Sequence, residues 1–194
     1  MPRWNSTVSK FSFALLVVAI TPLAWFLLKP LRALAPELAG VKCYVGNVCL
    51  DDSTRVEEAR ALRLEAIAFV EENVGKLEHS PHVILCTAAV CDKNFGFTGN
   101  AAYNLGAVHL VVATRGWHSY FLRHELIHNV QVERIVGFRM WLATPTWLIE
   151  GMAYSLSKDP RHPLQDPREN YRTTYEKWAA GMLANELRSR AKAL

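Results

Sequence analysis

Residues 124–128 read His-Glu-Leu-Ile-His and lie in the middle of a long helical pattern. Because residues four apart lie on the same face of a helix, the imidazoles of His124 and His128 can bind one metal ion. Glu125 is offset by about 100° around the helix axis, close enough to reach a metal-bound water without being a ligand. Two nitrogen ligands, a Lewis acid and a carboxylate base are the parts that hydrolysis needs. The motif therefore predicts a zinc site with Glu125 as the catalytic base.

A catalytic zinc ion needs a third protein ligand and one open coordination position. The best candidate is Glu150, which lies 22 positions after His128 in a second helical pattern. If residues 137–144 turn the chain, this second helix folds back across the first, and Glu150 faces the two histidines. Its neighbours are apolar: Trp147, Leu148, Ile149, Met152 and Ala153. A carboxylate buried among such side chains requires a partner, and a zinc ion would be one.

Hydrophobic periodicity and turn signals predict the elements that position these residues. In chain order they are a hairpin over 41–50, a helix over 54–77, strands over 82–86 and 107–113 with a Gly- and Asn-rich loop over 92–106 between them, and helices over 117–136, 144–157 and 168–192. The second helix of the site is expected to begin with Thr144 as its N-cap and Pro145 as its first residue. The order of helix, strands and helices predicts an α+β domain rather than a parallel α/β domain.

Length and charge exclude several classes of protein. A chain of 194 residues fits one domain with a short appendage, and 51% hydrophobic residues exclude a wholly disordered chain. The net charge of +4 arises in residues 1–35, which contain four lysines and arginines and no acidic residue. From Pro36 onward, 18 basic residues match 18 acidic ones. The body of the protein therefore lacks the electrostatic footprint of a nucleic-acid-binding protein, and no nucleic-acid partner is expected.

Residues 11–28 form an uncharged, mostly apolar run of 18 residues, preceded by Arg3 and Lys10. This length is at the short end of what spans a bilayer as a helix. A cleaved secretory signal and a buried core helix are the alternatives. We expect residues 1–35 to be a single-pass membrane anchor with short flanks, and residues 36–194 to be the folded domain.

The four cysteines are Cys43, Cys49, Cys86 and Cys91, and all of them follow the apolar run. An even number at close spacing favours disulfides in an oxidising compartment. A structural metal site and free buried thiols are the alternatives, and pairing of near neighbours is one of three possible connectivities. Together with the anchor, the cysteines predict a domain outside the cytoplasm, on the periplasmic or extracellular side.

The sequence resembles the gluzincin zinc metallopeptidases, in the peptidase MA-like branch, over about residues 82–159. Two motifs carry the resemblance: His-Glu-Leu-x-His at 124–128 and Pro-x-Trp-Leu-x-Glu-Gly-x-Ala at 145–153. The resemblance implies one Zn²⁺ per chain bound by His124, His128 and Glu150, with Glu125 as the base.

The resemblance also implies a zincin-like domain, in which a short sheet with an edge strand is joined by an active-site helix and a following ligand helix. The strand over 106–114 would then line the cleft and pair with an extended peptide. Several gluzincins have an aspartate four residues after the ligand glutamate, where this chain has Tyr154. The residue that orients His124 is therefore unassigned, and Asp159 is one candidate.

The expected function is that of a membrane-anchored zinc peptidase acting on a peptide or protein substrate outside the cytoplasm. Four residues downstream of the ligands could stabilise an oxyanion, and none is favoured over the others: Tyr154, His162, Tyr171 and Arg172. One alternative is a catalytically silent zinc-containing binding module tethered to the membrane. Another is a tethered interaction domain in which the motif is accidental. Glu125 favours the enzyme, because a pure binding site needs ligands but no base.

Overall fold

The computed structural model describes residues 28–135, 142–182 and 186. The predicted membrane segment over 11–28 therefore lies, apart from Leu28, outside the described residues. Across these ranges, no helix combines the length and the apolar composition that crossing a membrane requires.

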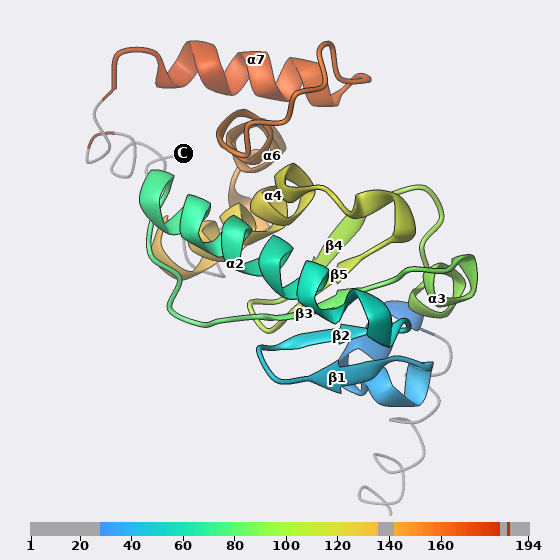
Figure 1. The fold of residues 1–194 in the computed structure, drawn as a ribbon. Helices are drawn as coiled ribbons and strands as arrows, with labels where there is room; N and C mark the ends of the chain where they lie inside the picture. The colour runs from blue at the N-terminus through green and yellow to red at the C-terminus, as the bar shows by residue number, and fades with distance from the viewer. Residues whose placement is uncertain (1–27, 136–141, 183–185, 187–194) are drawn as a thin grey trace, which may run out of the picture.

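A mixed sheet of five strands forms the centre of the domain, in the order β1-β2-β3-β5-β4 (Figure 1). Its strands are β1 (Lys42–Tyr44), β2 (Val48–Leu50), β3 (His82–Leu85), β4 (Ala102–Leu105) and β5 (His109–Val112). Strands β2, β3 and β5 are parallel to one another. The two outer strands, β1 and β4, run antiparallel to their neighbours. Together with the helices, this sheet confirms the predicted α+β class.

Helices cover both faces of the sheet and extend beyond it. The α-helices are α2 (Val56–Asn73), α3 (Ala89–Phe95), α4 (Ser119–Val130), α6 (Thr146–Leu156) and α7 (Arg168–Ala179). The 3₁₀ turns are η1 (Lys29–Leu34), η2 (Pro36–Ala39), η3 (Ser53–Arg55) and η4 (Thr114–Gly116), and a π turn, η5 (Gln131–Ile135), continues α4.

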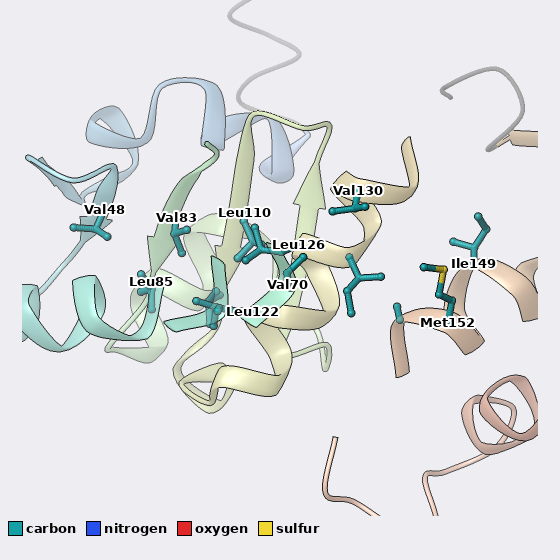
Figure 2. Close-up of a cluster of buried hydrophobic side chains, with 14 of the residues drawn as sticks. Val48, Val70, Val83, Leu85, Leu110, Leu122, Leu126, Val130, Ile149 and Met152 are labelled. Carbon is teal, nitrogen blue, oxygen red and sulfur yellow. The ribbon is translucent and has the colours of Figure 1, made fainter. Parts of the chain in front are cut away.

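The domain has two hydrophobic cores, one on each face of the sheet, because successive side chains of a strand point to opposite faces. One face presents Val48, Leu50, Val83, Leu85, Leu110 and Val112 to α2 and α4 (Figure 2). The other face presents Cys49, Ile84 and Val111 to α3 and the first two 3₁₀ turns. The strands are therefore buried on both faces, which agrees with their nearly continuous apolar sequences.

Helix α6 packs against α4, and α7 packs against the other side of α6 (Figure 1). The approach of α7 is close at Gly151, where an added Cβ atom would lie 2.2 Å from the carbonyl oxygen of Tyr171. Only glycine leaves room for this contact. The residue after the candidate ligand Glu150 is thus constrained by the packing of the last helix.

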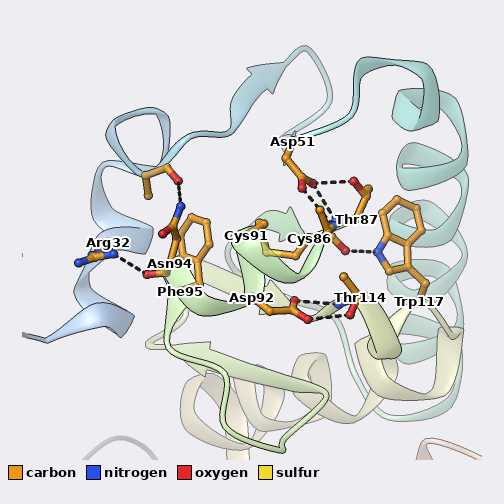
Figure 3. Close-up of a disulfide and its surroundings, with 12 residues drawn as sticks. Arg32, Asp51, Cys86, Thr87, Cys91, Asp92, Asn94, Phe95, Thr114 and Trp117 are labelled. Atoms are coloured by element: carbon orange, nitrogen blue, oxygen red, sulfur yellow. Dashed lines mark hydrogen bonds between the residues drawn. A yellow bond between two sulfur atoms is a disulfide. The ribbon is translucent and has the colours of Figure 1, made fainter.

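Two disulfides join cysteines that are near neighbours in sequence. This pairing is one of the three connectivities that the sequence left open. Cys43 and Cys49 are directly opposite each other in the β1–β2 hairpin, whose turn holds Gly46 and Asn47 at positive φ. Cys86 and Cys91 connect the end of β3 to α3 (Figure 3). Both bonds agree with folding in an oxidising compartment.

Hydrogen bonds from the ends of neighbouring strands surround the second disulfide (Figure 3). Asp51, after β2, accepts hydrogen bonds from the backbone N–H and hydroxyl of Thr87. Asp92 accepts the corresponding pair from Thr114. The indole of Trp117 donates to the carbonyl oxygen of Cys86. These carboxylates and aromatic groups are therefore structural.

The structure corrects the predicted strand arrangement. The segment 92–106, expected to be a loop, contains the end of α3 and the whole of β4. The predicted edge strand over 106–114 corresponds to β5, which is internal because it pairs with β3 on one side and β4 on the other. Strand β4 has the sequence Ala-Tyr-Asn-Leu, which lacks β-branched residues, so its strand propensity is weak.

Helix boundaries also differ from the expectation. The predicted helix over 117–136 is α-helical only to Val130 and then becomes the π turn. Helix α6 begins at Thr146, with Pro145 rather than Thr144 as its N-cap. Helix α7, within the expected helix over 168–192, ends at Ala179, and Gly181 follows at positive φ. Apart from Glu186, the part of this expectation beyond Met182 lies outside the described residues.

Candidate metal centre

Three side chains from two helices meet at one point. His124 and His128, one turn apart in α4, place their Nε2 atoms 3.2 Å apart. Glu150, in α6, has Oε2 3.5 Å from Nε2 of His124 and Oε1 3.5 Å from Nε2 of His128. One potential ligand atom from each residue lies within 4.8 Å of the others. The packing of α6 on α4 thus brings the predicted third ligand to the histidine pair.

These separations fit a metal ion. Ligand atoms about 2.0–2.1 Å from a tetrahedral zinc ion lie about 3.3 Å from one another. The distances of 3.2 and 3.5 Å between the three side chains are close to this value. Two imidazoles and one carboxylate form a known donor set of catalytic zinc sites, and the same donors accept other divalent ions of the first transition row. The cluster can therefore hold a metal ion and is compatible with zinc.

Gln131 orients His128 and was not identified from the sequence. Its Oε1 lies 2.8 Å from Nδ1 of His128, so that nitrogen donates and leaves Nε2 free to bind a cation. Its Nε2 donates to the backbone carbonyl of Ile149 at 2.9 Å. Because Ile149 precedes Glu150, one buried amide links a ligand of α4 to the backbone beside the ligand of α6.

Tyr154 lies beside His124 in the position where several gluzincins have an aspartate. The two rings are 4.4 Å apart and tilted by 54°. Over the described parts of the chain, no side chain hydrogen-bonds Nδ1 of His124. Asp159, one candidate for that role, instead accepts hydrogen bonds from the guanidinium and the backbone N–H of Arg161. His124 therefore packs against an aromatic ring, and the carboxylate that contacts it is that of Glu150, at Nε2.

Glu125, between the two histidines in sequence, lines the cavity next to the cluster. Burial raises the pKa of its carboxyl group to about 7, with a smaller lowering effect from His128 and a smaller raising effect from Glu150. Burial also lowers the pKa of His128, and His124 lowers it further. A carboxyl group of near-neutral pKa suits proton transfer, and a neutral imidazole is the form that binds metal.

Asn104 joins the edge strand to α4, the helix that carries the two histidines. It lies in β4 on the face turned toward α4, and its Nδ2 donates to the backbone carbonyl of Glu125 at 3.1 Å and to Oδ1 of Asn129. Asn129 is buried, one residue after His128. A polar pair thus holds β4 against the helix that carries the motif. An asparagine in an expected loop gave no sequence signal for this role.

A cavity of about 570 Å³ opens over the cluster. Its lining comes from β4 and the turn after it, from α4 with the π turn, and from α6: Ala102, Tyr103, Asn104, Gly106, Ala107, His124, Glu125, His128, Asn129, Val132, Glu150 and Tyr154. The three candidate ligands and Glu125 therefore face a space large enough for a peptide side chain and its flanking backbone.

Of the four possible oxyanion donors, only Tyr154 lines this cavity. His162 and Arg172 hydrogen-bond to each other at 2.7 Å, and Arg172 also pairs with Glu169. Tyr171 contacts Gly151 through its backbone carbonyl, in the interface between the last two helices. The roles of His162 and Arg172 are therefore structural.

Comparisons with known proteins identify no relative. No family model matches the chain, and no significant match is found among the curated proteins or the solved structures. The function is accordingly inferred from the two motifs and the geometry of the site.

Proposed function

We propose that the protein is a zinc-dependent peptidase with a gluzincin-type, zincin-like site. His124, His128 and Glu150 bind the metal, and Glu125 acts as general base. The observation that carries this proposal is the convergence of three donor atoms, at spacings that suit one ion, beside a carboxylic acid in an open cavity. A pure binding site would need the three ligands but not Glu125.

A zinc ion in this position would supply a Lewis acid that activates water and polarises the scissile carbonyl. Glu125 takes the proton from the attacking water and passes it to the leaving amine. Burial of this carboxyl group raises its pKa to about 7, so it can both accept and release a proton near neutral pH. The phenol of Tyr154, which lines the cavity, is the donor best placed to hydrogen-bond the developing oxyanion.

The substrate is an extended peptide that pairs with β4. Within the described sheet, β4 has a neighbour on one side only, so the backbone groups of its other edge are available for pairing. Ala102, Tyr103 and Asn104 of this strand line the cavity. Pairing there would bring a peptide bond over the metal centre, and Asn104 would hold the strand against α4.

We place this activity outside the cytoplasm. The two disulfides support an oxidising compartment. Single-pass anchoring through residues 11–28 is part of the same proposal and is supported by the length and apolar character of that run in the sequence.

The test is the substitution Glu125→Gln in the full-length protein, assayed for zinc content and for hydrolysis of a peptide library. We expect one zinc ion per chain in both proteins and a loss of hydrolysis of about 100- to 10,000-fold in the variant, because only the base is removed. The exposed Glu72→Gln is the matched control and should retain full activity.

A second variant, Glu150→Ala, tests the ligand set in the same preparation. It should lose most of its zinc while remaining folded, because two histidines alone bind zinc weakly. Zinc bound in a ligand-dependent way without any hydrolysis by the parent would favour the catalytically silent binding module. Unchanged hydrolysis by Glu125→Gln would refute the assignment of the base.

A further inference from the structure

A second, smaller cavity of about 70 Å³ adjoins the metal centre. The two cavities share four lining residues: Ala102, His124, Glu125 and Tyr154. The smaller one lies at the beginning of β4, where Asn100 and Ala101 line it, whereas the larger one reaches the turn at the other end of the strand. A peptide that follows β4 across the metal centre would therefore place one of its flanking residues at the smaller cavity.

Three arginines from three separate segments line this smaller cavity: Arg115 of η4, Arg161 after α6 and Arg168 at the start of α7. Apart from Glu125, the only acidic residue of the lining is Asp159. Both carboxylate oxygens of Asp159 accept hydrogen bonds from Arg161. The buried Asp159 therefore compensates one of the three positive charges.

Arg161 is further held in place by two aromatic rings. Its guanidinium carbon lies 5.2 Å from the ring centre of Tyr120 and 4.7 Å from that of Phe121. Such contacts restrict a guanidinium that is already paired. Arg161 thus forms a fixed wall of the cavity rather than a free binding group.

Arg115 and Arg168 are different, because both side chains are exposed and neither forms an ion pair with any acidic residue in the described ranges. Arg168 also acts electrostatically on Glu150 and Tyr154, which places it near the metal centre. Arg115 acts in the same way on Tyr120. Two uncompensated guanidinium groups therefore flank a small polar cavity next to the catalytic groups, although the folded domain as a whole has nearly equal numbers of acids and bases.

We propose that this cavity binds a carboxylate of the substrate through Arg115 and Arg168, so that the enzyme prefers peptides with a negative charge beside the scissile bond. The inference rests on the proposed function, because the cavity adjoins the same metal centre. Guanidinium groups bind carboxylates by paired, charge-assisted hydrogen bonds. The volume admits a carboxylate and its adjacent carbon atoms but excludes a large side chain. Either a C-terminal carboxylate or an Asp or Glu side chain supplies this group.

The experiment compares the full-length, zinc-loaded protein with the double variant Arg115→Gln/Arg168→Gln. Lys177→Gln is the control, because it removes a positive charge from the other end of α7. The probes are acetylated peptides prepared with a free or an amidated C-terminus, and with Glu or Gln at each position near the cleaved bond. Cleaved bonds are mapped by mass spectrometry, and kcat/KM is measured for each pair.

We expect the parent to cleave carboxylate-bearing peptides about 10-fold faster than their uncharged counterparts, a preference that the double variant loses and Lys177→Gln retains. Loss of the preference on amidation identifies the C-terminal carboxylate as the bound group. Loss on replacement of Glu by Gln identifies an acidic side chain. Equal kcat/KM for charged and uncharged peptides in the parent would overturn the inference while leaving the peptidase assignment intact.

A binding measurement separates this inference from the proposed function. Zinc-loaded Glu125→Gln protein, with and without the two arginine substitutions, is titrated with the same peptides by calorimetry. Tighter, arginine-dependent binding of the carboxylate forms would support the cavity even if the parent hydrolysed nothing, in which case the peptidase proposal alone would fail. Equal affinity for peptides with and without the carboxylate would refute the inference, whether or not the protein hydrolyses peptides.

Discussion

Gln131 determines which nitrogen of His128 faces the candidate metal centre. An imidazole that donates from Nδ1 presents an unprotonated Nε2, and the amide oxygen of Gln131 at 2.8 Å selects that tautomer. The same amide reaches the backbone beside Glu150, so the histidine and the carboxylate share one support. At the scale of single residues, the geometry of the site therefore depends on a side chain outside the motif.

Two substitutions of Gln131 test whether its hydrogen bond to His128, rather than its packing in the core, supports metal binding. We expect Gln131→Ala to weaken zinc binding about 10- to 100-fold, as substitutions of groups that orient metal ligands do. Gln131→Glu retains an acceptor for His128 and should keep zinc affinity near that of the parent. Affinity is measured by competition with a chromogenic chelator, with the exposed Gln165→Ala as control. Equal losses in both Gln131 variants would contradict an orienting role.

At the scale of elements, the site is built from one edge strand and two crossed helices. Strand β4 supplies a pairing edge and the link from Asn104 to α4. Helix α4 carries the motif and ends in a π turn, a feature that often marks functional sites. Helix α6 brings Glu150, and its position depends on α7, which packs closely on Gly151.

Gly151→Ala tests whether the close packing of α7 positions the third ligand. In an unhindered helix this change would stabilise the protein by about 1 kcal/mol. Here the new methyl group meets the carbonyl of Tyr171, and we expect a loss of about 1–3 kcal/mol in the free energy of unfolding. Urea denaturation measures the change. Ser155→Ala, which removes a more exposed contact between the same helices, should cost less. A more stable Gly151→Ala variant would show that α7 moves away at no cost.

At the scale of the whole molecule, the sheet separates two hydrophobic cores. One face packs against the helices that carry the candidate metal ligands, and the other packs against the core that contains the second disulfide (Figures 2 and 3). These two regions meet at Tyr103 of β4, which lines the cavity and whose hydroxyl donates to the backbone carbonyl of Phe95 in α3. None of the four cysteines lines that cavity.

Removal of either disulfide should lower the free energy of unfolding but should have little effect on metal binding. Each bond closes a loop of only five or six residues, for which loop-closure entropy gives about 2 kcal/mol of stabilisation. We expect a loss of that size in Cys43→Ala/Cys49→Ala. The loss should be larger in Cys86→Ala/Cys91→Ala, because both of those side chains are buried, whereas Cys43 is only partly buried. Urea denaturation and zinc content are measured on both. Loss of zinc from a folded variant would contradict this separation.

The sequence alone was sufficient for features that depend on short separations along the chain. The spacing of His124 and His128 places them on one helix face. The close spacing of the four cysteines favoured disulfides, but the pairing of near neighbours came from the structure. The α+β class also followed from periodicity, since runs of Val, Ile and Leu identified β3 and β5. Glu150 was predicted as the third ligand from its apolar neighbours, although it lies 22 positions after His128 in the sequence.

Only the tertiary structure decided which distant groups surround those residues. Nothing local distinguishes Asn104 or Gln131 from other polar side chains, because their partners lie on other elements. The identity of the edge strand depended on pairing partners of β5, which periodicity does not specify. Arg115 and Arg168 are 53 residues apart and look like ordinary surface cations. Helical and strand periodicity reports which face of an element is buried, whereas contacts between elements arise only when those faces pack together.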